Sequence, residues 1–443
     1  MLPRKISPTP VRTFIFLLIL PFVCRVTFGQ EAPISSQERS IVETMLQDVK
    51  SDIKGSYYEP TFHGVDLDSR FKEATERVKT AKTYNQAIAT VAWTLRPLND
   101  SHTFLVPPRR TYKLIYGYQY MMVGDDCYVS AVEPGTDAEH MGLKVGDRIL
   151  SFNKVVPTRE NLWELGYLFR VLRPQPVDEL SLRAADGSER TLRIPPKVKP
   201  ETYSISIGMN YWDLIRESQS YRHLLRRRSF ALGESAIIWK FPSFAVSEKA
   251  IDEMIAESDK YPAVILDLRG NPGGAVLALL RLIENVSEKD FAVATPVMRK
   301  SAPSLLAKGR GDKAYHGKLV VLVDNRSASS SEVFARTMQL QKRATIIGDG
   351  TSGSVMEARF HFHALGLGSR QGYGVMISEA DFLMPDGKSL EHTGVVPDEK
   401  VLPTATDLAN HRDPVLSHAA HLVGAELSPE DAGQLFPIEW TKD

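Results

Sequence analysis

The chain has 443 residues, with 54 Lys and Arg balanced by 54 Asp and Glu. Hydrophobic residues make up 43% and charged residues 24%, as in an average globular protein, which excludes an extensively disordered chain. The balanced charge gives no overall field to attract a phosphate backbone, so we do not expect nucleic acid as a partner. This length predicts roughly two to four domains.

The N-terminus carries a pattern typical of export. Residues 14–24 form an apolar run that follows basic residues and is shorter than the ~20 residues needed to span a bilayer. We therefore predict a signal peptide over residues 1–29, no stable membrane span after its cleavage, and a periplasmic or secreted protein. An uncut N-terminal anchor is the alternative. Removal of the signal would leave Cys127 as the one cysteine, which excludes an internal disulfide.

The next segment, residues 30–110, is predicted to be an N-terminal helical bundle. Apolar residues recur three and four positions apart in residues 36–54 and 84–95, as on the buried face of a helix. His102 follows the second of these helices and precedes the apolar residues 103–106. It is therefore expected at a helix-to-strand corner.

Residues 111–198 change to short β-type runs with turn signals, and residues 141–150 (MGLKVGDRIL) resemble the most recognisable stretch of a PDZ domain. The resemblance implies an inserted PDZ-like β-rich domain that grips a peptide terminus and adds the peptide to a sheet edge. The residues implied for this contact are Gly117, Tyr118, Gln119 and Tyr120. A PDZ-shaped spacer with a blocked groove is the alternative, because the two tyrosines are bulky for such a site.

Residues 199–443 are predicted to form an α/β core. A buried-type strand at 263–268 is followed by a helical run at 275–286, and a second strand at 319–323 is followed by a helix at 331–341. Strand, loop and helix repeated in this way predict a mixed, parallel-biased sheet with its active site at the carboxyl ends of the strands.

Two loops that leave these strands could carry chemistry. Gly273 and Gly274 would let a substrate carbonyl approach backbone amides closely, although the same sequence suits an ordinary turn. Ser329 stands where a helix begins, and the positive end of a helix favours a nucleophile there. The competing interpretation is a capping box, in which Ser329 and Glu332 only satisfy helix amides.

Four ordered motifs then carry a family resemblance. The chain resembles the carboxyl-terminal processing peptidases and the related tricorn-type serine peptidases through residues 267–274 (DLRGNPGG), 327–332 (SASSSE), 348–353 (GDGTSG) and 394–398 (GVVPD). The resemblance implies Ser329 as the nucleophile. It also implies an oxyanion hole made of the backbone amides of Gly273 and Ser330.

The base is where the two branches of that family differ. The processing branch has a lysine 25 residues after the serine, but that position here is Ser354, whose hydroxyl cannot act as a base near neutral pH. The tricorn-like branch implies a histidine from a Ser-His pair, here His102, and a glutamate before the last motif, here Glu391. His102 would take the Ser329 proton, and Glu391 would hold the other ring nitrogen.

The sequence thus predicts an exported serine peptidase that acts on a peptide or protein substrate and needs no metal or cofactor. His361 and His363 alternate on a likely strand, but no third metal ligand is fixed by their spacing. A non-catalytic peptide- or ligand-binding protein is one alternative, since Ser354 replaces the lysine. An esterase that uses the same triad is another. The oligomeric state is left open.

Overall fold

The computed structural model describes residues 32–200, 227–365, 372–438 and 440, so the predicted signal peptide lies outside the described residues. The chain divides into two units, Met1–Ala32 and Pro33–Asp443, and all described helices and strands belong to the second unit. Within these ranges, no helix is both long and apolar enough to cross a membrane.

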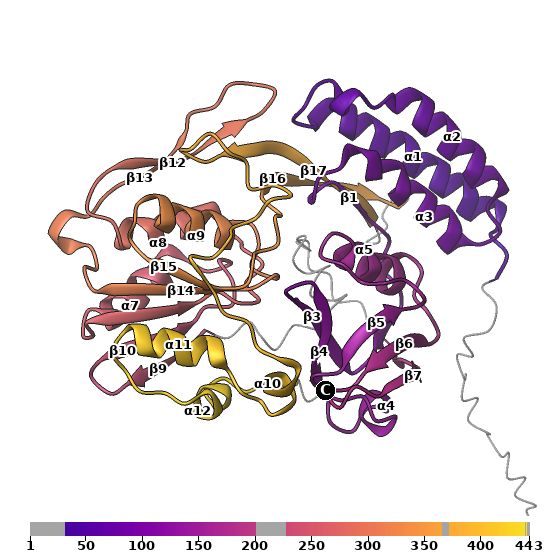
Figure 1. Ribbon diagram of the computed structural model, residues 1–443. Coiled ribbons are helices and arrows are strands. Elements are labelled where there is room, and N and C mark those ends of the chain that lie inside the picture. The colour runs from indigo at the N-terminus through magenta and orange to yellow at the C-terminus, as the bar shows by residue number, and fades with distance from the viewer. Residues whose placement is uncertain (1–31, 201–226, 366–371, 439, 441–443) are drawn as a thin grey trace, which may run out of the picture. The chain divides into compact units, whose positions relative to one another are not determined.

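The second unit opens with three helices, α1 (Ser36–Ser56), α2 (Leu67–Thr80) and α3 (Tyr84–Leu95), which confirms the predicted helical bundle (Figure 1). The buried residues of α1 recur three and four positions apart, and form the stripe that meets the other two helices: Val42, Met45, Leu46, Val49 and Ile53. Side-chain caps begin all three helices, at Ser35, Asp66 and Thr83.

A sheet built from distant parts of the chain completes this core. Strand β17 (Gly372–Leu383) pairs antiparallel with β1 (Phe104–Val106), β16 (Met356–Ala364) and β12 (Phe291–Val297), and β12 pairs in turn with β13 (Leu305–Ala307). The hydrophobic cluster of the bundle takes in residues of both β1 and β17. The strand that follows His102 is therefore held in place by a strand more than 250 residues later in the chain (Phe104 pairs with Met376).

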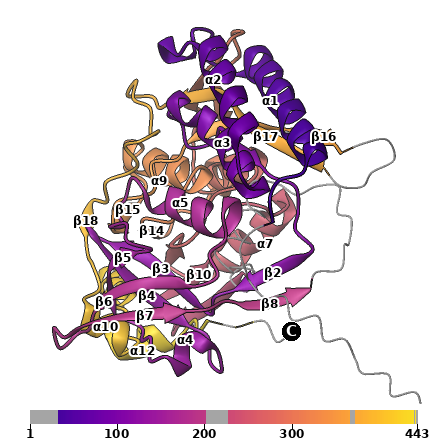
Figure 2. The same ribbon diagram turned by 90° about the vertical axis from the view of Figure 1, so that its right-hand side faces the viewer.

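The β-rich segment begins and ends with two adjacent strands, β2 (Tyr112–Ile115) and β8 (Lys197–Pro200), which pair antiparallel. Between them lies a five-stranded sheet, seen in Figure 2, in the order β3-β4-β5-β6-β7, with β3 at one end. Its strands are β3 (Tyr118–Val123), β4 (Asp126–Val132), β5 (Arg148–Phe152), β6 (Asp178–Arg183) and β7 (Glu189–Ile194). Short helices α4 (Asp137–His140) and α5 (Leu162–Gly166) and a π-helical turn (Tyr167–Leu172) accompany the sheet.

The core is a six-stranded sheet in the order β18-β15-β14-β11-β10-β9. Its strands are β9 (Arg228–Leu232), β10 (Ala236–Lys240), β11 (Ala263–Asp267), β14 (Lys318–Val323), β15 (Thr345–Gly348) and β18 (Glu399–Lys400). All neighbours pair in parallel except β9 with β10. The predicted fold class, a mixed and parallel-biased α/β core with a helical bundle and a β-rich insertion, is confirmed.

Helices cover both faces of this sheet. Side chains alternate between the two faces along each strand, so each strand contributes apolar residues to both layers of helices. Trp239 and Leu266 point to a cluster that includes α7 (Glu248–Ser258), α8 (Val276–Asn285) and α9 (Ser330–Leu340). Ile238 and Ile265 point to the opposite cluster, with α11 (Pro414–Leu422) and α12 (Pro429–Gln434) (Figure 1). The short helix α10 (Ala405–Ala409) precedes α11.

Candidate active site

Ser329 lies in a strained turn between β14 and α9. Its backbone has φ 54° and ψ −119°, a region that a residue with a side chain rarely adopts. The turn packs tightly against the loop after β11, since a Cβ added to Gly273 would lie 2.7 Å from the Cβ of Ser329. Glycine at 273 is therefore required for the close approach of the two loops.

Glu332 holds this turn from inside the core. Its fully buried carboxylate accepts the amides of Ser329 (3.0 Å), Ser354 (2.9 Å) and Gly353 (2.7 Å) and the hydroxyl of Thr351 (2.6 Å). Burial raises the pKa of Glu332 to about 7, because its effect is larger than that of the four hydrogen bonds, which lower the pKa. One carboxylate thus ties the Ser329 turn to the loop that follows β15.

The capping box that competes with a catalytic role is present at the same turn. The Glu332 carboxylate accepts the Ser329 amide, as the capping box requires. The Glu332 amide, however, donates to the Ser329 carbonyl oxygen at 2.9 Å, so helix α9 does not depend on the hydroxyl for this contact. Capping and catalysis are therefore compatible at Ser329.

His102 stands at the corner before β1, as predicted, and is 5% exposed. The Asp100 carboxylate shapes the corner by accepting the amides of His102 (3.0 Å) and Thr103 (2.7 Å) and the hydroxyl of Ser378 on β17 (2.6 Å). Burial lowers the pKa of His102 to about 4, so the imidazole is neutral at physiological pH.

A chain of hydrogen bonds joins His102 to Glu391. The Ser101 hydroxyl lies 2.7 Å from His102 Nδ1 and donates to Glu391 Oε2 at 3.0 Å. Because a hydroxyl has a single proton, the Ser101 oxygen accepts from Nδ1–H, and His102 keeps the lone pair on Nε2. Glu391 is fixed further by the amides of Ser101 (2.7 Å) and Val355 (2.8 Å), and burial raises its pKa above the usual range.

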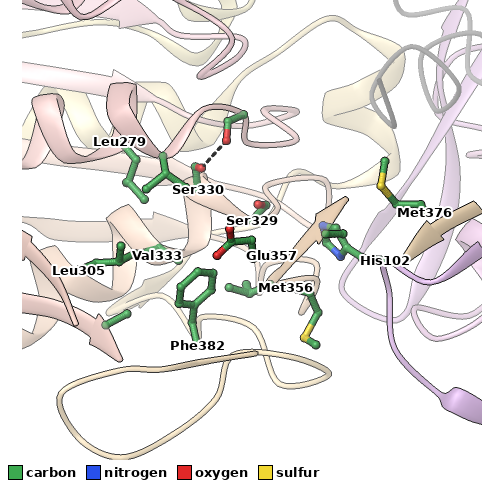
Figure 3. Close-up of a pocket in the computed structure, with 15 residues that line it drawn as sticks. His102, Leu279, Leu305, Ser329, Ser330, Val333, Met356, Glu357, Met376 and Phe382 are labelled. Carbon is green, nitrogen blue, oxygen red and sulfur yellow. Dashed lines mark hydrogen bonds between the residues drawn. The ribbon is translucent and has the colours of Figure 1, made fainter. Parts of the chain in front are cut away.

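Ser329 and His102 line the same cavity, of about 230 Å³ (Figure 3). Most of its wall is apolar and comes from α8, α9 and the sheet that contains β17: Val276, Leu279, Ala294, Leu305, Val333, Val355, Met356, Met376 and Phe382. Among the described residues that line it, Glu357 and His102 carry the ionisable side chains. The cavity thus presents a serine and a neutral imidazole beside an apolar pocket.

The sequence profile of peptidase family S41 matches residues 238–401, a span that holds Ser329 and Glu391. This stretch of the chain is similar to peptidase family S41. The predicted enzyme class, a serine-type peptidase, is thereby confirmed.

Known relatives extend the similarity beyond that span. The chain is 23% identical to the chloroplastic carboxyl-terminal-processing peptidase 3 of Arabidopsis thaliana, covering 83% of this chain and 70% of the relative. It is 25% identical to a carboxyl-terminal-processing protease of a Picosynechococcus species, covering 72% and 74%. Crystallised mature CPAF shares its fold, with a TM-score of 0.63 and 14% identity over 84% of this chain and 95% of CPAF.

One predicted contact in the peptidase is corrected by the structure. Glu391 was expected to hold the Nδ1 side of His102 itself, but the Ser101 hydroxyl occupies that place and passes the contact on to Glu391. Sequence reasoning named the Ser-His pair without giving Ser101 a role. Its position directly before His102 is the one sequence signal that pointed to it.

A second correction concerns the predicted oxyanion hole. The Gly273 amide donates to Asn271 Oδ1 at 2.8 Å, in a local turn, so this N–H already has an acceptor. Gly274 and Ser330 line the cavity instead, and neither amide donates to a protein acceptor among the described residues. The Ser330 hydroxyl donates to the Gly274 carbonyl at 3.0 Å, which holds the two loops together (dashed line in Figure 3).

No lysine stands where the processing branch would need one. Ser354 fills that position, with its carbonyl accepting the Ser329 amide at 2.9 Å and its hydroxyl 2.9 Å from that of Ser352. Lys388, the lysine nearest in sequence to Glu391, is exposed in a turn. His363, half of the pair considered for a metal, lies 2.6 Å from Asp52 on α1, where it ties β16 to the bundle.

The four residues implied for peptide binding by the β-rich domain are all buried: Gly117, Tyr118, Gln119 and Tyr120. The two tyrosine side chains belong to the hydrophobic cluster of that domain, where their rings lie 5.0 and 5.1 Å from the Arg170 guanidinium. The Tyr118 hydroxyl donates to buried Asp178 at 2.7 Å. These side chains therefore pack inward and are not available to contact a peptide.

Proposed function

We propose that this peptidase hydrolyses peptide bonds with Ser329 as the nucleophile, His102 as the general base and Glu391 as the acid that orients the base through Ser101. The observation that carries this assignment is the hydrogen-bond chain from His102 Nδ1 through Ser101 to Glu391, because it leaves Nε2 as the basic nitrogen in a cavity that Ser329 also lines. A Ser–Lys dyad has no residue at the required position.

The reaction would follow the usual course of a serine peptidase. His102 Nε2 takes the Ser329 proton as the hydroxyl oxygen attacks the substrate carbonyl, and the imidazolium returns it to the leaving amine. The amides of Gly274 and Ser330 would stabilise the negative charge that develops on the carbonyl oxygen. Water then attacks the acyl ester by the reverse use of the same groups. Glu391 and Ser101 stabilise the imidazolium that forms in each step.

The low pKa of His102 sets a requirement for this mechanism. An imidazole with a pKa of about 4 is neutral and ready to accept a proton, but it is a weak base. The buried Glu391 carboxylate, reached through Ser101, supplies the negative charge that favours the imidazolium once it forms. We therefore expect the basicity of His102 to rise as the reaction proceeds, rather than before substrate binds.

The proposal includes export and a role of the β-rich domain in substrate engagement. The apolar run of residues 14–24 after basic residues supports a signal peptide. Since Tyr118 and Tyr120 face inward, a substrate peptide would add to the backbone of β3, which stands at the end of its sheet. Fractionation of cells that produce the full chain, with N-terminal sequencing of the product, tests export directly.

Covalent labelling by a fluorophosphonate tests the assignment of the nucleophile. Wild type should be labelled and should cleave peptides, Ser329→Ala and His102→Ala should lose both properties, and Ser188→Ala, at an exposed serine, should keep them. An unlabelled and inactive wild type would indicate a binding protein on this fold. A wild type that is labelled and hydrolyses esters, but does not hydrolyse peptides, would indicate an esterase.

A further inference from the structure

We propose that Glu357 selects substrates, favouring those with a Lys or Arg next to the side chain that enters the apolar cavity and disfavouring those with a carboxylate there. This inference rests on the proposed function, since it assigns the substrate class of the same site. The feature behind it is a carboxylate at a cavity that is otherwise almost entirely apolar.

Glu357 lies beside an irregularity in the pairing of β16 with β17. The register between β16 and β17 shifts after Glu357, which is opposite Ala380, whereas Ala358 is opposite Ser378. The extra residue is Glu379 on β17, so the pleat of the two strands is locally out of step beside Glu357. Glu357 is exposed, lines the cavity together with Ser329, and is drawn with the other lining residues in Figure 3.

The Glu357 carboxylate has no partner within the described residues, because no hydrogen bond or ion pair engages it there. The neighbouring charged residue of the same strand differs in this respect, since Arg359 lies 3.1 Å from Glu379. His102 is the other ionisable side chain of the cavity and is neutral at physiological pH. The described lining therefore carries one net negative charge beside the nucleophile.

The two parts of the cavity recognise different parts of a substrate. Its apolar wall, from Leu279 and Leu305 to Phe382, suits an aliphatic side chain. A Lys or Arg on either side of that residue would bring a positive charge toward Glu357, and a neighbouring Asp, Glu or free α-carboxylate would be repelled. The attraction is that of a solvent-accessible ion pair, so a preference of about three- to fivefold over a neutral residue is expected.

Matched peptides test this preference. Each has a single Leu flanked, on one side or the other, by Lys, Gln or Glu, and kcat/KM is measured for wild type, Glu357→Gln and Glu357→Lys. Wild type should cleave in the order Lys, Gln, Glu. The order should flatten in Glu357→Gln and reverse in Glu357→Lys, and the wild-type preference should weaken in 0.5 M salt. Glu234→Gln, at an exposed acid in the β9–β10 turn, should retain the wild-type order.

Protection of Ser329 from the fluorophosphonate by the same peptides measures binding independently of turnover. Equal rates and equal protection for the Lys and Glu peptides, or a preference unchanged in Glu357→Gln, would overturn the role of Glu357 while leaving the proposed function intact. Failure of the wild type to react with the fluorophosphonate would overturn the proposed function itself.

Discussion

Replacing Ser101 by alanine removes one hydroxyl and tests the proposed orientation of the base. The hydroxyl is the acceptor of His102 Nδ1–H at 2.7 Å and a donor to Glu391 at 3.0 Å. The backbone amide of residue 101 would still donate to Glu391, and the Val355 amide would hold the other oxygen. The variant therefore separates the side-chain link from the placement of Glu391.

The expected loss follows from the buried group left without a partner. His102 is 5% exposed, so an Nδ1–H without an acceptor costs about 1–3 kcal/mol. This cost favours the tautomer with its proton on Nε2, which cannot accept the Ser329 proton there. It also leaves the imidazolium without its contact to Ser101. If that energy is lost from the transition state, kcat/KM falls by about fivefold to 150-fold. Ser101→Thr keeps a hydroxyl at the same place and should recover most of the activity.

The assay is steady-state hydrolysis of a fluorogenic peptide, with thermal unfolding measured on the same preparations. A Ser101→Ala variant that keeps its activity within twofold of wild type would refute the relay. If Ser101→Ala is unfolded at the assay temperature, Ser101→Thr decides the question. A Ser101→Thr variant that is folded but inactive would also refute the relay.

Four further outcomes are expected. Because burial lowers the pKa of His102 to about 4, the acidic limb of the kcat/KM profile should have its midpoint near pH 4, and a midpoint near 6.5 would contradict the burial of this ring. In the unfolded chain the histidine binds a proton below its ordinary pKa, so its burial should reduce stability as pH falls from about 6.5 to 4, an effect that His102→Gln should remove. Burial raises the pKa of Glu332 to about 7, so the effect of Glu332 on stability has the opposite sign to that of His102. The free energy of unfolding should fall by about 3 kcal/mol as pH rises from about 4.5 to 7. Denaturant unfolding of Glu332→Gln should show no such dependence on pH. The φ of 54° at Ser329 is costly for any residue with a Cβ, so Ser329→Gly should be more stable than Ser329→Ala by about 1 kcal/mol in denaturant unfolding, and equal stability would show that the turn is not strained.

Local sequence patterns predicted the framework because each element buries a face that its own residues define. The spacing of apolar residues in α1 and α3, and the continuous apolar strands β11 and β14, are enough to give the bundle and the parallel core. The position of Ser329 came from ordered motifs resembling those of a known family, and its strained backbone sets it apart from an ordinary helix cap.

The details of the site depend on which side chains meet when distant loops come together. Ser101 and Glu391 are 290 residues apart. A small shift in the position of Glu391 would decide whether its carboxylate contacts the imidazole directly or through the Ser101 hydroxyl, and no local sequence pattern encodes that position. The Gly273 amide was misassigned because the Asn271 side chain competes for it two residues away. Tyr118 and Tyr120 were expected to face a ligand, but Arg170 attracts both rings into the core.

The pairing of β1 with β17 gives the peptidase an order of assembly during synthesis. A ribosome releases His102 and Ser329 well before the residues of β17 and Glu391, and until then β1 has no strand to pair with and the Ser101 hydroxyl has no acid to bind. Contacts between such distant segments form late in folding. A nascent chain from which β17 has not yet emerged therefore carries Ser329 and His102 without the strand pairing and the acid contact that complete the candidate site.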